Sequence, residues 1–338
     1  MKAGVLFGKN DIRYTDWETP VIGDNDLLVK IKMTGICGSD IPRVLGDGAH
    51  YYPVVLGHEF SGEVVEIGKN AAGFELGDRV SGAPLVPCME CADCQNGNYS
   101  LCKNYTFIGS RIQGSFAEYV KLPAQNAVKF DKSISFEQGA FFEPSTVAIH
   151  GLRCADFKGG GDVAVLGGGT IGLFTMQWAK IFGSKSVTVY DISDARLALA
   201  KKLGADYVVN TAREEIKKGS ADWLFETAGQ VKTMQDAFEI AGNKAGICFI
   251  GTPHENLTFT PKLWENMNRK EFKLTGSWMS YSAPFPGEEW DLTAHYFKTG
   301  QLKFDENLIF EKFHMSEIDK AFDLYRQNKV GGKILLYN

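Results

Sequence analysis

The sequence predicts an α/β protein with two domains, one built on a mainly antiparallel sheet and one on a doubly wound parallel sheet. Strands and helices alternate after a glycine-rich turn at 167–172, which is typical of a parallel sheet. Residues before 150 are instead rich in valine and glycine turns, with few helical stretches. The chain has 338 residues, and about 100–200 residues per domain suits two domains. We expect the parallel-sheet domain over 151–283 and the other domain from 1–150 together with 284–338.

Composition and charge indicate a folded globular protein and argue against nucleic acid or membranes as partners. Apolar residues make up 44% and charged residues 23%, as in a folded globular chain. There are 36 lysines and arginines against 41 aspartates and glutamates, so the net charge is −5. A mildly acidic chain without a basic block is a poor partner for nucleic acid or anionic membranes. We find no export signal and no membrane span, and therefore expect a cytoplasmic protein with reduced thiols.

Four of the seven cysteines form a dense C-x2-C-x2-C-x7-C motif. The four are Cys88, Cys91, Cys94 and Cys102. Four thiolates complete a tetrahedral zinc site and leave no position for water or substrate, which predicts a structural zinc ion. A redox C-x-x-C pair would not explain four cysteines. A nucleic-acid zinc finger should carry basic residues where this loop carries Glu90 and Asp93.

The parallel-sheet domain opens with a dinucleotide-binding pattern. A β-branched strand at 162–166 runs into Gly167, Gly169 and Gly172, and residues 170–182 have helical apolar spacing. This G-x-G-x-x-G arrangement gives a tight turn, a close approach to a pyrophosphate and close helix–strand packing. The helix N-terminus would bind the pyrophosphate.

Asp191 indicates which dinucleotide is bound. It ends a second predicted strand, 186–190, and stands 19 residues after Gly172. A carboxylate at this place accepts hydrogen bonds from ribose hydroxyls and repels a 2′-phosphate, which favours NAD over NADP. A helix cap is the alternative role for Asp191, and the two roles are compatible. The later elements are expected at 194–203, 207–210, 222–225, 231–241, 246–250 and 272–275.

A second metal site is suggested by Cys37, His58 and Glu143, which lie outside the cysteine motif. Three such ligands leave a fourth zinc position open for water or an alcohol. By spacing alone, a core thiol and a hydrogen-bonded core histidine are the more common interpretations. Glu143 stands in an otherwise apolar run, and a buried carboxylate needs a partner.

The order of these motifs resembles the zinc-dependent medium-chain alcohol dehydrogenases over essentially the whole chain. The resemblance rests on Gly57-His58-Glu59, on 61–65, on the four-cysteine motif and on the glycine motif. Three stretches are similar to the polyol dehydrogenases that act on galactitol 1-phosphate: 37–53, 107–111 and 276–290. The family implies a GroES-like fold for the antiparallel domain and a Rossmann fold for the parallel one.

The resemblance also implies roles for particular residues. It places a catalytic zinc on Cys37, His58 and Glu143, with Glu59 as an alternative ligand. A structural zinc on the four-cysteine motif gives two zinc ions per chain. Ser39 would be the first proton acceptor, with a turn residue as its alternative role. Pro42 stands where some relatives have a proton-relaying histidine.

The implied reaction transfers a hydride from a secondary hydroxyl of a sugar-alcohol phosphate to NAD+, giving a keto-sugar phosphate. Galactitol 1-phosphate is the expected substrate. Arginine suits a phosphate because its planar fork donates two hydrogen bonds at once. The candidate substrate residues are Arg43, His50, Tyr51, Arg111 and Trp278.

Three alternatives remain open at this point. The substrate could be an unphosphorylated polyol of the sorbitol type or another secondary alcohol. The chain could also be a zinc- and NAD-binding relative without turnover. Each candidate arginine could be a surface residue paired with an acid. By analogy with the family, we expect a homo-oligomer, either a dimer or a tetramer.

Overall fold

The computed structural model describes all 338 residues, which cluster into two compact units. Unit 1 comprises Met1–Glu143, Tyr281–Thr299 and Glu306–Asn338, and unit 2 comprises Pro144–Ser280 and Gly300–Asp305. The segment 300–305 thus clusters with unit 2, although the sequence-based division assigns it to the other domain. Hydrogen bonds explain this difference. The Gln177 side chain accepts from the Lys303 backbone N–H at 2.7 Å and donates to its carbonyl at 3.3 Å.

Unit 1 is built mainly on antiparallel strands. A seven-stranded sheet has the order β10-β6-β5-β3-β18-β17, with β9 paired to β3, and only β17 and β18 run parallel. Smaller sheets pair β2-β1-β4 and β7-β8. The strands are β1 (Lys2–Gly8), β2 (Asp11–Asp16), β3 (Asp26–Gly35), β4 (Val54–Val55), β5 (Glu59–Ile67), β6 (Arg79–Gly82), β7 (Leu85–Val86), β8 (Thr106–Phe107), β9 (Tyr119–Pro123), β10 (Ala127–Lys129), β17 (Ile309–His314) and β18 (Lys333–Tyr337).

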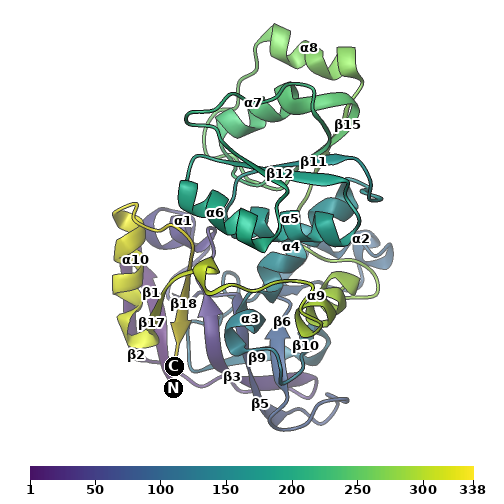
Figure 1. Ribbon diagram of the computed structural model, residues 1–338. Coiled ribbons are helices and arrows are strands. Elements are labelled where there is room, and N and C mark those ends of the chain that lie inside the picture. Colours follow the sequence, from purple (N-terminus) through teal and green to yellow (C-terminus); the bar gives the residue numbers. More distant parts are fainter. The chain divides into compact units, whose positions relative to one another are not determined.

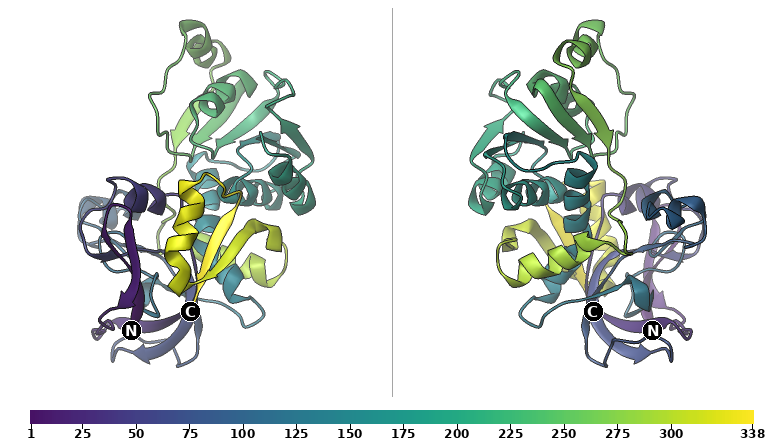
Figure 2. Two further views of the ribbon diagram at one scale, coloured as in Figure 1. Left: turned by 90° about the vertical axis from the view of Figure 1, so that its left-hand side faces the viewer. Right: turned by 90° about the vertical axis from the view of Figure 1, so that its right-hand side faces the viewer.

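The helices of unit 1 are short and connect or cover these strands. They are α1 (Asp40–Leu45), α2 (Ala92–Gln95), α3 (Phe136–Ala140), α9 (Glu288–Lys298) and α10 (Ile318–Arg326). The helix α10 packs Ile318, Ala321 and Phe322 into an apolar cluster with β1 and β18. Both chain ends lie in this unit, as Figure 2 shows. The C-terminal strand β18 is therefore an interior strand of the main sheet, next to β3.

Unit 2 contains a six-stranded, fully parallel sheet of order β13-β12-β11-β14-β15-β16. Figure 1 shows α5 and α6 on one face of it and α7 and α8 on the other. The strands are β11 (Asp162–Leu166), β12 (Ser186–Asp191), β13 (Tyr207–Asn210), β14 (Ala221–Glu226), β15 (Ala241–Phe249) and β16 (Lys273–Gly276). The helices are α4 (Phe142–Cys154, which starts in unit 1), α5 (Thr170–Ile181), α6 (Asp194–Leu203), α7 (Val231–Ile240) and α8 (Pro261–Lys270).

The predicted α/β fold class is confirmed. The strand order of unit 2 reverses direction between β11 and β14, which is the switch point where doubly wound sheets bind ligands. Val163 and Val165 of β11 and Val187 and Val189 of β12 are buried, as expected for interior strands of a sheet covered on both faces. The helix α8 was not predicted; few of its residues are apolar and none is buried. No helix in the structure combines the length and the apolar character that crossing a membrane requires.

Candidate active site

The four-cysteine motif forms a compact loop around α2. The four sulfur atoms lie within 4.8 Å of one another, and Cys94 and Cys102 are buried. The sulfur of Cys88 is 3.5 Å from that of Cys102 and 4.0 Å from that of Cys94. Zinc–sulfur bonds of about 2.3 Å in a tetrahedron require sulfur separations of about 3.8 Å. The loop therefore fits a zinc ion with four thiolate ligands.

The backbone of this loop also favours thiolates. The N–H groups of Cys88 and Cys91 donate to the sulfurs of Cys102 and Cys88, both at 3.4 Å. The pKa of Cys91 is lowered to about 6, first because the backbone N–H of Cys94 donates to its sulfur. Metal-free Cys94 has its pKa raised to about 12 by burial. A cation bound here would stabilise the charged form of the buried sulfurs.

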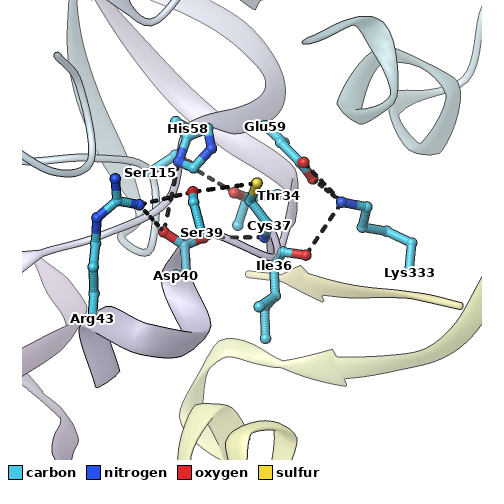
Figure 3. Close-up of polar contacts among 10 residues, drawn as sticks. All are labelled: Thr34, Ile36, Cys37, Ser39, Asp40, Arg43, His58, Glu59, Ser115 and Lys333. Atoms are coloured by element: carbon cyan, nitrogen blue, oxygen red, sulfur yellow. Dashed lines mark hydrogen bonds and ion pairs between the residues drawn. The ribbon is translucent and has the colours of Figure 1, made fainter. Parts of the chain in front are cut away.

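The second cluster forms where β3 ends and β5 begins. These strands are antiparallel, and their register places Gly35 opposite Glu59. Cys37 follows the end of β3 and His58 precedes β5, so both lie at the same end of the sheet. Ligand atoms of Cys37, His58 and Glu59 lie within 4.8 Å of one another (Figure 3). Glu143, the third ligand that the family resemblance implies, is not among these three.

Asp40 joins this cluster from the first turn of α1, and sequence reasoning missed it. Its Oδ2 accepts the Cys37 backbone N–H at 3.1 Å, and its Oδ1 lies 3.6 Å from Nδ1 of His58 (Figure 3). Asp40 is fully buried, and burial raises its pKa although His58 and Arg43 lower it. The carboxylate thus orients both candidate ligands. Its position three residues after Cys37 was the available signal.

Lys333 is the second residue that the sequence did not reveal. Its Nζ donates to the two carboxylate oxygens of Glu59 at 2.6 and 2.7 Å and to the Ile36 carbonyl at 3.2 Å (Figure 3). Burial lowers the pKa of Lys333, but the charges of Glu59 and Cys37 and the hydrogen bond to Glu59 together outweigh burial, so the pKa is raised overall. The two residues are 274 positions apart in the chain, so no local pattern could have linked them.

Gly35 makes this ion pair feasible. Glu59 is on β5 and Lys333 on β18, and β3 runs between these two strands. A Cβ atom at Gly35 would lie 2.5 Å from the Glu59 carboxylate and 3.3 Å from the Lys333 side chain. Any larger residue would therefore obstruct the path that joins the two charges across β3.

Glu143 lies on the first turn of α4 and is half-buried. Its pKa is raised to about 7, first by burial and then by the negative charge of Glu59, while His58 opposes this shift. These influences place Glu143 within electrostatic reach of the cluster. The choice between Glu59 and Glu143 as a metal ligand stays a prediction.

The charge balance around this cluster favours a bound cation. The acidic groups are Cys37, Asp40, Glu59 and Glu143, and the positive groups are Arg43 and Lys333. With all four acids ionised against two positive charges, two negative charges remain uncompensated. Burial, and after it the negative charge of Glu59, raises the pKa of Cys37. In addition, Nδ1 of His58 is buried and makes no hydrogen bond. A divalent cation would neutralise the excess, and a thiolate–imidazole–carboxylate donor set suits zinc.

Ser39 and Arg43 adjoin this cluster directly. The exposed Ser39 donates to the Cys37 sulfur at 3.4 Å and accepts from Arg43 at 2.9 Å. Arg111 stacks on Tyr105, with its guanidinium 4.5 Å from the ring centroid. The pKa of His50 is lowered by burial, then by the positive charges of Arg111 and Arg43.

The positive charges of Arg43 and Arg111 therefore both reach His50, which lies on the loop after α1, whereas Arg111 comes from a separate loop. Phe107, at the start of the segment that carries Arg111, contacts the His58 ring edge-on with centroids 5.4 Å apart. Tyr51 is 37% exposed and adjoins His50 in the chain. Trp278 belongs to unit 2 and is 56% exposed. Of the five predicted substrate residues, Arg43 and Arg111 lie within electrostatic reach of His50, and substrate contact by all five stays a prediction.

The glycine motif of unit 2 borders a cavity of about 540 Å³. Gly167 has φ of +104°, and a Cβ at Gly172 would lie 1.8 Å from the Gly167 carbonyl. Asp191 accepts from the backbone N–H groups of Gly168 at 2.7 Å and Ser193 at 2.8 Å. The lining includes Gly167, Gly169, Tyr190, Asp191, Arg196, Thr227, Ala228, Gln230 and Thr233. The cavity lies at the switch point and has the size and lining of a nucleotide site.

Comparisons with known proteins match both units. Residues 23–132 match the alcohol dehydrogenase GroES-like domain family, and residues 170–295 match the zinc-binding dehydrogenase family. The chain is 38% identical over 345 residues to galactitol 1-phosphate 5-dehydrogenase of Escherichia coli, covering 99% of both chains.

Other relatives extend the comparison. A crystal structure of galactitol-1-phosphate dehydrogenase from Escherichia coli matches with a TM-score of 0.95 and 37% identity, covering 100% of both chains. L-threonine 3-dehydrogenase of Colwellia psychrerythraea is 32% identical over 342 residues, covering 95% of both chains. These relatives share one fold but act on different alcohols, so the substrate must be argued from side chains.

Replacing one cysteine in each cluster should distinguish the catalytic from the structural zinc site. We expect about two zinc ions per chain in the wild type and about one in Cys37→Ser and in Cys91→Ser. Only Cys91→Ser should lower the thermal midpoint markedly, by about 5 °C or more, because that zinc ties a loop. Zinc analysis and thermal unfolding measure both effects, with Cys154→Ser as the matched control. Unchanged zinc content and midpoint in Cys91→Ser would contradict the four-thiolate site.

Breaking the Glu59–Lys333 ion pair should lower the free energy of unfolding. Lys333→Met leaves Glu59 buried without its cation and should destabilise the protein by about 3–5 kcal/mol. Combining it with Glu59→Gln should restore part of that loss, because the double variant buries no unpaired charge. Urea unfolding of the four proteins under identical zinc conditions gives the coupling energy. Simply additive effects of the two substitutions would show that the pair is not an energetic unit.

Proposed function

The chain belongs to the zinc-binding alcohol dehydrogenase family, and we propose that it oxidises a secondary hydroxyl of a sugar-alcohol phosphate, galactitol 1-phosphate in the first instance. The observation that carries this proposal is the buried, net-negative group of Cys37, His58 and Glu59. A zinc ion there and a nicotinamide dinucleotide would supply Lewis-acid activation of the hydroxyl and a hydride acceptor. A non-catalytic relative would have no need of such an open site.

Residues of this chain would accept the proton of that hydroxyl and pass it to solvent. Ser39 lies 3.4 Å from the Cys37 sulfur and is exposed, so a proton received on its oxygen has a path to solvent. Arg43 donates to the same oxygen at 2.9 Å, which fixes the position of the hydroxyl. Pro42 has no side-chain acceptor, so proton release follows Ser39 directly rather than a histidine at that place. Asp40 and Lys333 hold the candidate ligands in position.

The basic group of Arg43, His50 and Arg111 supports a phosphorylated substrate. The Arg111 side chain donates to the Tyr105 hydroxyl at 3.3 Å and pairs with no carboxylate, so its other donors are available to a ligand. Arg43 is shared with Asp40 at 3.2 Å and faces the metal cluster. Three neighbouring basic side chains with a single acidic partner form a favourable place for a phosphate dianion. Tyr51 and Trp278 remain candidates for contact with the polyol.

Asp191 supports NAD as the cofactor. Its carboxylate borders the 540 Å³ cavity and is held by two backbone N–H groups, which leaves lone pairs free for ribose hydroxyls. A 2′-phosphate at the same place would meet a negative charge. Arg196 lies 3.7 Å from this carboxylate and partly offsets its charge.

We also propose that the protein is a cytoplasmic homo-oligomer, a dimer or a tetramer. The strand β16 is at the end of the parallel sheet and pairs with β15 on one side only. An open sheet edge favours pairing with a second copy. The helix α8 buries none of its residues, and its Trp264 is 45% exposed. A reducing compartment would keep the four thiolates of the structural site available for zinc.

Replacing Arg111 tests the phosphate contact. Arg111→Ala should raise KM for galactitol 1-phosphate about tenfold, because a charge-assisted hydrogen bond is lost, and leave KM for galactitol nearly unchanged. Steady-state NADH formation with both substrates measures the split. Arg13→Ala, an exposed arginine on β2, is the matched control. Equal effects on the two substrates would remove Arg111 from phosphate binding and favour an unphosphorylated polyol or other secondary alcohol.

Replacing Asp191 tests the cofactor preference. Asp191→Asn removes the charge that opposes a 2′-phosphate and keeps an acceptor for one of the two backbone N–H groups, because those of Gly168 and Ser193 donate to different carboxylate oxygens. We expect the ratio of kcat/KM for NADP to that for NAD to rise about tenfold or more. A ratio equal to that of the wild type would refute the ribose role of Asp191.

A further inference from the structure

Glu226 is a buried acid that the proposed chemistry does not use. It is the last residue of β14, which lies between β11 and β15 in the parallel sheet. Its side chain is fully buried. Its backbone carbonyl accepts the N–H groups of Ile250 at 2.8 Å and Gly251 at 3.0 Å. The residue therefore stands where the turns after β14 and β15 meet.

The carboxylate of Glu226 organises the turn that follows it. One oxygen, Oε1, accepts the backbone N–H groups of Ala228 and Gly229 at 2.9 Å each and the Thr233 hydroxyl at 2.7 Å. The helix α7 starts at Val231, and its N-cap residue Gln230 makes no side-chain capping bond. Glu226 thus ties the two residues before the N-cap, and a hydroxyl of the first turn of α7, to the end of β14.

The second carboxylate oxygen of Glu226, Oε2, is tightly packed. Oε2 is buried and has no hydrogen-bond partner. A Cβ atom at Gly251 would lie 2.6 Å from it, so a glycine is required there. Burial raises the pKa of Glu226, and the three donors on Oε1 oppose that shift. A group this costly to bury needs a compensating role.

The turn held by Glu226 is one wall of the 540 Å³ cavity. Thr227, Ala228, Gln230 and Thr233 all line it. The Thr227 hydroxyl lies 3.0 and 3.1 Å from the carbonyls of Leu166 and Gly167, which joins this wall to the glycine turn. The position of the carboxylate therefore fixes two sides of the cavity at once.

We propose that Glu226 is a positioning residue for the dinucleotide: by accepting three hydrogen bonds on one oxygen, it holds the 227–230 turn in the conformation that binds the cofactor. This inference rests on the proposed function only in that the cavity is taken to hold a nicotinamide dinucleotide. Glu226 acts through the turn and does not itself need to contact the cofactor.

Three variants test the role of the acceptor. Glu226→Leu keeps the approximate volume but removes the acceptor, Glu226→Gln keeps the acceptor without the charge, and Glu226→Asp withdraws the acceptor by one methylene. We expect the Kd for NADH to rise about tenfold or more in Glu226→Leu, several-fold in Glu226→Asp and less than about threefold in Glu226→Gln. Glu255→Gln, an exposed glutamate of the same unit, is the matched control.

The readouts are NADH binding by fluorescence titration and kcat at saturating cofactor, on the zinc-loaded full-length protein. Weaker binding with kcat nearly unchanged supports a positioning role, and Glu226→Asp preserves the test if Glu226→Leu does not fold. A lower thermal midpoint with an unchanged Kd in Glu226→Asp and Glu226→Leu would overturn the proposal and leave Glu226 a purely structural cap. A wild type that binds no NADH would instead contradict the proposed function.

Discussion

The buried ion pair between Glu59 and Lys333 is the interaction on which the candidate metal centre depends. It joins β5 to β18 across the intervening strand β3, and only a glycine at position 35 leaves room for it. The pair fixes Glu59 beside Cys37 and His58 and satisfies a carboxylate that would otherwise be buried alone. The C-terminal strand therefore contributes to the site as much as the motifs near the N-terminus do.

Both units contain buried carboxylates that accept hydrogen bonds from backbone N–H groups of a neighbouring loop. In unit 1, Asp40 is shared by the Cys37 backbone, His58 and Arg43. In unit 2, Asp191 and Glu226 accept backbone N–H groups of the turns that border the cofactor cavity. In each case the acid orders a loop at the end of a strand, and the reactive or binding groups stand on that loop. Because a buried carboxylate must be hydrogen-bonded, each of these acids holds its loop in one conformation.

Local patterns predicted most of the fold and part of the site. The four-cysteine motif, the glycine turn and the strand that ends at Asp191 are each contained in a short segment, and pattern and spacing were enough to find them. Asp40 was within reach of the same reasoning, since it stands three residues after Cys37. Lys333 was not, because its partner is 274 positions away and a lone lysine near the chain end carries no signal. Glu226 was hidden for a related reason: its donors lie close in sequence, but its burial depends on Gly251 of another turn. Arg43 and His50 lie on α1 and the loop that follows it, but only the folded chain brings the charge of Arg111, from a separate loop, within reach of His50.

The most direct test of this account is the catalytic preference of the zinc-loaded wild type for a phosphorylated over a plain polyol. The measurement is kcat/KM for galactitol 1-phosphate and for galactitol, followed by NADH formation. Two charge-assisted hydrogen bonds to the phosphate predict a preference of at least about a hundredfold for the phosphorylated substrate. Equal values for the two substrates, or turnover that survives complete removal of zinc, would contradict the account.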